Sequence, residues 1–110
     1  ANPAASVLVP GQPTAGVRCA YATPGWLLAS WPLDTGSLPR IVHAINALPR
    51  GSLVGAAPAF EHDVVRFDYA DGSSRTLLVR LGDPTVYTDG AHSGLDHANR
   101  VTDQLRTAAR

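Results

Sequence analysis

Apolar and polar residues alternate in two stretches of the chain, and each stretch predicts a β-hairpin. In the first, residues 17–22 and 26–33 flank a Thr-Pro-Gly segment whose proline and glycine suit the central positions of a type II turn. In the second, residues 64–69 and 74–81 flank an Ala-Asp-Gly segment. Pro32 cannot donate a hydrogen bond to a β-ladder, so it indicates a sheet edge or the end of its strand.

The second hairpin has two possible registers. A two-residue Asp71-Gly72 loop mixes apolar and charged residues on both sides, whereas a three-residue loop with Gly72 in a G1 bulge separates them. Because a slip by one residue exchanges the faces of a strand, the apolar pattern favours the three-residue loop. One side then carries Val65, Phe67, Tyr69, Leu77, Val79 and Leu81, and the other carries Val64, Arg66, Asp68, Ser74, Thr76, Leu78 and Arg80.

Helical spacing of apolar residues predicts two helices. The first begins after Ser37, a good N-cap residue, and ends before Pro49 and Gly51. The second is predicted over residues 92–110, with Ser93 as its N-cap, and follows a short strand from Thr85 to Thr88. The apolar stripes are Leu38, Ile41, Val42, Ile45 and Leu48 in the first helix, and Leu95, Ala98, Val101, Leu105 and Ala108 in the second.

The order of these elements, ββαβββα, predicts an α+β fold. We expect a largely antiparallel sheet of four to five strands with two helices packed on one face and the other face open to solvent. Residues 17–110 form one domain, and residues 1–16, rich in proline and glycine, form an extended arm or linker. Within the arm, Val7, Leu8 and Val9 could pair with a sheet edge of this chain or of a partner; the alternative is a disordered tail.

Composition excludes some classes of partner and indicates a compartment. The chain of 110 residues carries nine basic residues, all arginine, and nine acidic residues, so its net charge of zero does not favour nucleic acid or an anionic membrane. No apolar run is long enough to span a bilayer. The chain lacks methionine, which indicates a processed form or an excised domain, and its start resembles a mature terminus after signal cleavage. We therefore expect a secreted or cell-surface protein.

Cys19 is the only cysteine, so an intramolecular disulfide is impossible. In a secreted protein a single cysteine is either a small buried apolar residue or half of an intermolecular disulfide. Its position inside a predicted strand, away from the terminus, argues against lipid attachment. The buried thiol is the favoured interpretation, and the intermolecular bridge stays open as the alternative.

No motif indicates catalysis, a metal or a cofactor. His92 and His97 are five residues apart and therefore point in different directions on a helix, which does not suit a metal site. The chain has no Gly-x-Ser-x-Gly elbow and no phosphate-binding loop. A spatial cluster of catalytic residues would not show in the sequence, so a small hydrolase or ligand carrier remains a third hypothesis.

Three segments together resemble a known group of proteins. They are Val17–Ala22 with Cys19, the helix end at 44–51, and the hairpin at 64–83. Over roughly residues 17–83 the chain resembles small secreted actinobacterial proteins of unknown function, which carry further cysteines after the helix and after the hairpin, whereas this chain has none there. The order of a strand with its cysteine, a helix, a loop and a hairpin is also similar to that of the Streptomyces subtilisin-inhibitor family. This resemblance implies a protease-binding loop at Gly55–Phe60.

Without a catalytic motif, we expect a non-enzymatic interaction module that binds another protein. Its contacts would come from the arm and from the open sheet face, where Arg66 and Arg80 are displayed. Trp26 and Trp31 lie five apart on one predicted strand and should face opposite sides, with one of them in the core. The other either lies on the open face, where it could anchor a partner, or is covered by the N-terminal arm. The alternative is a protease inhibitor that uses residues 55–60. The residues expected to contact a partner are Val7, Leu8, Val9, Trp26, Arg66 and Arg80, with Cys19 as a possible bridge.

Overall fold

The structure is a computed structural model that describes residues 7–22, 26–51, 61–81, 85–90, 92–97 and 99–108, with the backbone alone for Ala22, Trp26 and Glu61. The elements are β1 (Ala15–Ala22), β2 (Trp26–Pro32), a 3-10 turn η2 (Thr35–Ser37), α1 (Leu38–Asn46), β3 (Glu61–Asp68), β4 (Ser74–Arg80), β5 (Thr85–Thr88), β6 (Ser93–Asp96) and α2 (Arg100–Ala108).

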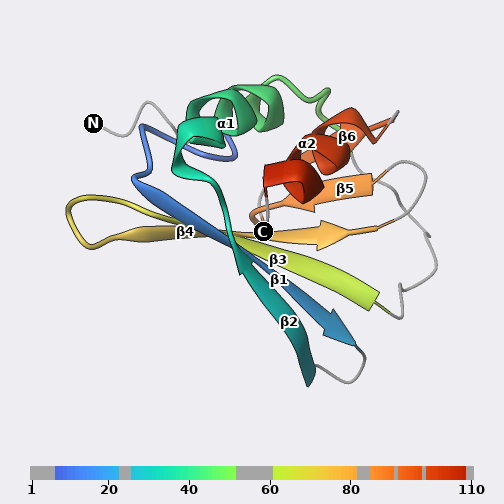
Figure 1. Cartoon of the computed structure of the whole chain (residues 1–110). Helices are drawn as coiled ribbons and strands as arrows, with labels where there is room; N and C mark the ends of the chain where they lie inside the picture. Colours follow the sequence, from blue (N-terminus) through green and yellow to red (C-terminus); the bar gives the residue numbers. More distant parts are fainter. Residues whose placement is uncertain are drawn as a thin grey trace.

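The six strands among the described residues form one antiparallel sheet in the order β2-β1-β3-β4-β5-β6. Both helices lie on the same side of this sheet (Figure 1). The predicted α+β fold with an antiparallel sheet and two helices is therefore confirmed. The predicted count of four to five strands and the order ββαβββα are wrong in detail, because β6 adds a sixth strand before the last helix.

The β3–β4 hairpin has the register that the apolar pattern predicts. Val65 pairs with Leu77 and Phe67 pairs with Arg75. The turn is closed by hydrogen bonds from the N–H of Tyr69 to the carbonyl of Ser73 and from the N–H of Gly72 to the carbonyl of Tyr69. Gly72 has φ of +88°, a conformation that glycine adopts without steric cost. The predicted three-residue loop is thus confirmed.

The prediction of one helix over residues 92–110 is wrong. Ser93 is not a helix cap but pairs with Thr88, so the segment before α2 is a strand. The true helix start is capped by Asp96, whose carboxylate accepts hydrogen bonds from the backbone N–H groups of Arg100 and Thr102. Gly94 permits the strand to pass close to Leu48, because an added Cβ would lie 2.9 Å from the Cβ of that leucine.

Helix α1 follows the predicted apolar stripe. Its buried residues are Leu38, Ile41, Val42 and Ile45, and Leu48 packs against the same core after the helix ends. Ser37 occupies the predicted N-cap position, but its hydroxyl donates to the carboxylate of Asp34 rather than accepting from the helix backbone. The side-chain cap expected at this position is therefore absent.

The N-terminal segment packs as part of the core. Leu8 and Val9 are fully buried, and the side-chain amide of Asn46 both accepts from the N–H of Val9 and donates to its carbonyl. The hydroxyl of Tyr69 donates to the carbonyl of Pro10. These contacts tie the segment between α1 and the β3–β4 turn, which corrects the expectation of a separate arm at Leu8 and Val9.

The two edges of the sheet differ. Beyond β6, the N–H of Leu95 donates to the carbonyl of Pro49 and the N–H of Gly51 donates to the carbonyl of Ser93, so residues 49–51 cover that edge. Pro32 is the last residue of β2, which is the strand at the other edge, in agreement with the sheet edge or strand end predicted for it. A bulge places Leu28 between the pairs Ala29–Ala20 and Leu27–Tyr21. This extra residue interrupts the alternation of side chains between the two faces along β2. The prediction that Trp26 and Trp31 face opposite sides assumed a regular alternation.

Candidate interaction surface

The helix face of the sheet contains polar residues, and they have partners. Arg18 on β1 donates from Nε to Oδ2 of Asp63 on β3 at 2.6 Å, and the two side chains are 14% and 4% exposed. The guanidinium carbon of Arg18 also lies 4.8 Å from the centre of a Trp31 ring. This pair joins β1 to β3 on the side of the sheet that carries the helices.

A second polar group on the helix face joins the sheet to α2. Thr102 donates from its hydroxyl to Asp96 at 2.9 Å, so the hydroxyl of Tyr87, 2.9 Å from that of Thr102, acts as donor to it. Burial raises the pKa of Tyr87 far above its usual value, and the nearby carboxylates of Asp96 and Asp63 add to the effect. Tyr87 is therefore a neutral, buried hydrogen-bond donor that fixes α2 on the sheet.

The opposite face of the sheet, which we call the open face, has an apolar centre. Strand alternation places there Val17, Cys19 and Tyr21 of β1, Val64 of β3 and Leu78 of β4. Leu78 is 37% exposed, and the other four are partly exposed. Neither helix lies over this face, nor does the described N-terminal segment (Figure 1). We refer to these five residues as the apolar centre.

Charged and aromatic residues flank the apolar centre. Nε of Arg66 lies 3.1 Å from Oδ1 of Asp68, and both side chains are exposed. At the other end of β3 the ring of His62 stacks on the ring of Tyr21, with centroids 5.5 Å apart and an angle of 9° between the planes. Arg80 is exposed and forms no ion pair with the described residues. One end of the face is therefore basic, and the other carries a closed ion pair.

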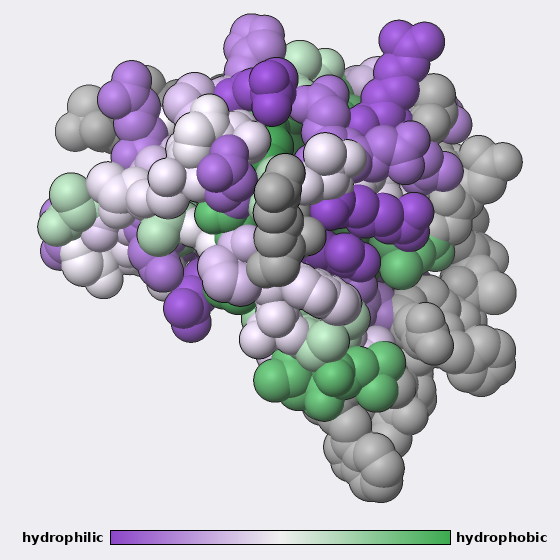
Figure 2. Space-filling model, viewed as in Figure 1, coloured by the Kyte–Doolittle hydropathy of each residue, from purple (hydrophilic) through white to green (hydrophobic). Residues whose placement is uncertain are grey.

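The β1–β2 hairpin extends the apolar surface. Leu27, which pairs with Tyr21, is 55% exposed, and the bulged Leu28 is 58% exposed. Figure 2 shows hydrophobic side chains gathered at the lower end of the molecule, where β2 runs in Figure 1. Since adjacent exposed leucines contribute little to a core, this end of the hairpin enlarges the area that a partner could cover.

The structure brings together only part of the predicted contact set. Arg66, Arg80 and Cys19 share the open face, whereas Leu8 and Val9 are in the core on the other side. Val7 is partly exposed next to these core residues. The side chain of Trp26 and the inhibitor-like segment 55–60 lie outside the described residues.

Cys19 differs from its predicted environment. It is a free cysteine, partly exposed on the open face, and not the buried core thiol that the sequence favoured. The apolar centre around it was missed as a contact surface, although the choice of faces in the β3–β4 hairpin already placed Val64 and Leu78 outside the core. The sequence did not indicate which face of β1 points away from the helices, because that orientation depends on the pairing of Arg18 with Asp63.

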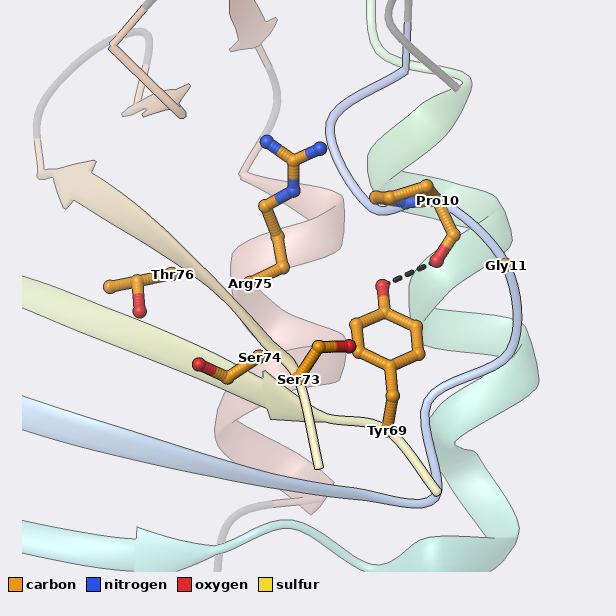
Figure 3. Close-up of a pocket in the computed structure, with 7 residues that line it drawn as sticks. All are labelled: Pro10, Gly11, Tyr69, Ser73, Ser74, Arg75 and Thr76. Carbon is orange, nitrogen blue, oxygen red and sulfur yellow. Dashed lines mark hydrogen bonds between the residues drawn. The ribbon is translucent and has the colours of Figure 1, made fainter. Parts of the chain in front are cut away.

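The described part of the chain also has surface pockets outside the apolar centre. A shallow pocket lies beside the β3–β4 turn, where Tyr69 points toward Pro10 (Figure 3). Arg75, which also lines the pocket, forms an ion pair of 3.4 Å with Asp89. Hydroxyls of Ser73, Ser74 and Thr76 line it, and its seven lining residues include no histidine, cysteine or carboxylate. The hydroxyl of Ser73 donates to the carboxylate of Asp71 in the adjoining turn.

The described residues contain no group of three or more histidine, cysteine or acidic side chains arranged to hold a metal ion. His92 lies 3.7 Å from Asp89 in the turn between β5 and β6, outside any helix. No helix in this part of the chain combines the length and apolarity that a membrane crossing requires.

Comparison of the chain with known protein families, with curated proteins and with solved structures gives no match.

Proposed function

We propose that this chain is a non-enzymatic interaction module, secreted or held at the cell surface, that binds another protein through its open face. The observation that carries the proposal is the apolar centre, a set of contiguous apolar side chains that no described element covers. Exposed apolar patches with a polar rim are typical of protein contact sites. Arg66, Asp68 and Arg80 supply such a rim.

The face suits a partner better than either sheet edge does. Residues 49–51 already cover the β6 edge. At the β2 edge, Pro32 removes one backbone donor and the bulge at Leu28 interrupts the ladder, two features that oppose strand addition. A partner that packs on side chains needs neither edge. The open face therefore supports a side-chain interface rather than an extended sheet.

Charge favours a protein over nucleic acid or an anionic membrane. The net charge of the chain is zero, and Arg66 on the open face is already paired with Asp68. A nucleic-acid surface would need several unpaired basic residues in a row, because phosphate contacts supply most of its affinity. The open face instead combines apolar area with charges of both signs, which is the composition of a protein–protein interface.

A photo-cross-linking experiment tests the proposal with a matched control. The photoreactive residue p-benzoylphenylalanine replaces Thr76, exposed on the open face, or Thr107, exposed on α2. We expect ultraviolet light to give a discrete protein adduct at Thr76 in the producing cells or their culture medium, and none at Thr107. Equal adduct patterns at both positions, or no adduct at Thr76, would contradict the proposed contact surface.

A further inference from the structure

We infer that a protein bound on the open face is a second copy of this chain, packed sheet against sheet with its β3 antiparallel to the β3 of the first copy. This inference rests on the proposed use of the open face for binding. It adds an identity for the partner and a geometry for the contact. The layout of charges along β3 and β4 carries it.

The charges of the open face lie at two separate ends. Arg80 on β4 lies beside His62 on β3. These two residues directly follow and precede, in their strands, the paired residues Val79 and Asp63. Asp68 is six positions from His62 on the same strand, which corresponds to roughly 20 Å. Among the described residues, Arg80 at one end has no ion-pair partner, and the carboxylate of Asp68 at the other end has only Arg66 as its partner.

A dimer of identical faces must obey a two-fold axis that lies between the two sheets. If the axis runs along the strands, each basic end meets the basic end of the other copy. If the axis crosses the strands at right angles, the basic end of each copy meets the carboxylate end of the other. Only the second arrangement sets Asp68 opposite His62 and beside Arg80 of the other copy, so like-charge repulsion selects it.

The apolar centre lies between these ends and would meet itself across the same axis. Val64 and Leu78 are paired neighbours near the midpoint of the face, with Cys19 on the other side of Val64. Burial of this centre would supply affinity, and the charged ends would fix the orientation. A net charge of zero leaves no long-range repulsion between two copies.

Two charge-reversal variants test the inference when they are mixed. In sedimentation equilibrium of the full chain, we expect a monomer–dimer equilibrium for the unchanged protein. Arg80→Glu alone and Asp68→Arg alone should each weaken the dimer about tenfold or more, because each places like charges opposite one another. Their equimolar mixture should recover a dimer, since each end then carries opposite charges. Circular dichroism establishes that both variants are folded.

Arg106→Glu, an exposed charge reversal on α2, is the matched control. Alone, it should dimerise like the unchanged protein. Mixed with Asp68→Arg, it should give no more dimer than the unchanged protein gives when mixed with Asp68→Arg. A monomer at every concentration up to about 1 mM, the weak end of specific affinities, would overturn the inference. A mixture no more dimeric than its components would overturn the antiparallel arrangement.

Cys19 provides an independent readout on the unchanged protein. Sheets packed face to face lie about 10 Å apart, so a short bismaleimide should join two Cys19 thiols near the middle of the interface. The Arg80→Glu variant should lose this product. If the chain sediments as a monomer while Thr76 still gives an adduct to a different protein, the self-association is wrong and the proposed function stands. If the chain is a monomer and Thr76 gives no adduct, both the self-association and the proposed function are wrong.

Discussion

The two faces of the sheet are built from the same strands but use their residues in opposite ways. On the helix face, Asp63 and Asp96 are buried, and each has a polar partner that offsets its removal from water. On the open face, Leu78 is an apolar residue that no described element covers. The comparison teaches that polar residues inside this protein serve the fold, whereas apolar residues outside it are available for binding.

The largest difference between the faces should appear when one apolar side chain is removed from each. Phe67→Ala on the helix face should lower the free energy of unfolding by about 3–5 kcal/mol, because the side chain is fully buried. Leu78→Ala on the open face should cost less than about 1 kcal/mol. Urea titration followed by circular dichroism measures both. Equal losses would show that the open face is packed like a core.

Removal of a charged side chain should also lower the free energy of unfolding more on the helix face than on the open face. Asp63→Ala should lower the free energy of unfolding by about 3 kcal/mol or more, because it leaves the largely buried guanidinium of Arg18 without its counter-ion. Asp68→Ala, which removes an exposed partner of Arg66, should change stability by less than about 1 kcal/mol. The double variant Arg18→Leu/Asp63→Leu should be less damaged than Asp63→Ala, and the same urea titrations decide this.

A smaller effect is expected at Tyr87. Tyr87→Phe should cost about 1 kcal/mol at neutral pH, because it removes the hydrogen bond to Thr102. Burial raises the pKa of Tyr87 in the folded chain, whereas the unfolded phenol ionises near pH 10, at about its usual value. The contribution of the Tyr87 hydroxyl to the free energy of unfolding is therefore fully present below about pH 10 and is lost as the pH rises above that value. The variant should lose less stability than the unchanged protein between about pH 10 and 11 in urea titrations, and an identical loss in both would refute this role.

The smallest effect on stability should come from the hairpin leucines. Leu28→Ser should change the free energy of unfolding by less than about 0.5 kcal/mol, because the side chain is already largely exposed. The same change should shorten retention on a hydrophobic-interaction column. Leu33→Ser, at a buried position near the end of the same hairpin, is the control and should destabilise the fold strongly. Similar stabilities for both variants would contradict the assignment of Leu28 to the exposed surface.

Local patterns predicted the parts of the fold that local chemistry decides. The register of the β3–β4 hairpin follows from the alternation around Phe67 and from the turn at Gly72, and both operate within a few residues. The apolar stripe of α1 is similarly complete within its own segment. These predictions succeeded because tertiary contacts reinforce the local preference instead of opposing it.

The remaining features depend on residues far apart in the chain. β6 has only four residues, and it is a strand because β5 and residues 49–51 supply its hydrogen bonds. Leu8 and Val9 are buried because Asn46, 37 positions from Val9, satisfies the backbone of Val9. The inward orientation of Arg18 requires Asp63 on another strand. The open face could therefore be predicted for β3 and β4, but not for β1.

The reactivity of Cys19 with a thiol reagent tests most directly whether the open face is uncovered. At a few micromolar protein, where self-association is weakest, we expect the folded chain to react at a rate that does not change with urea below the unfolding transition. The rate should fall as the protein concentration rises, because a second copy covers the thiol. A reaction that occurs only through global unfolding, at every protein concentration, would place Cys19 in a packed interior and contradict the account.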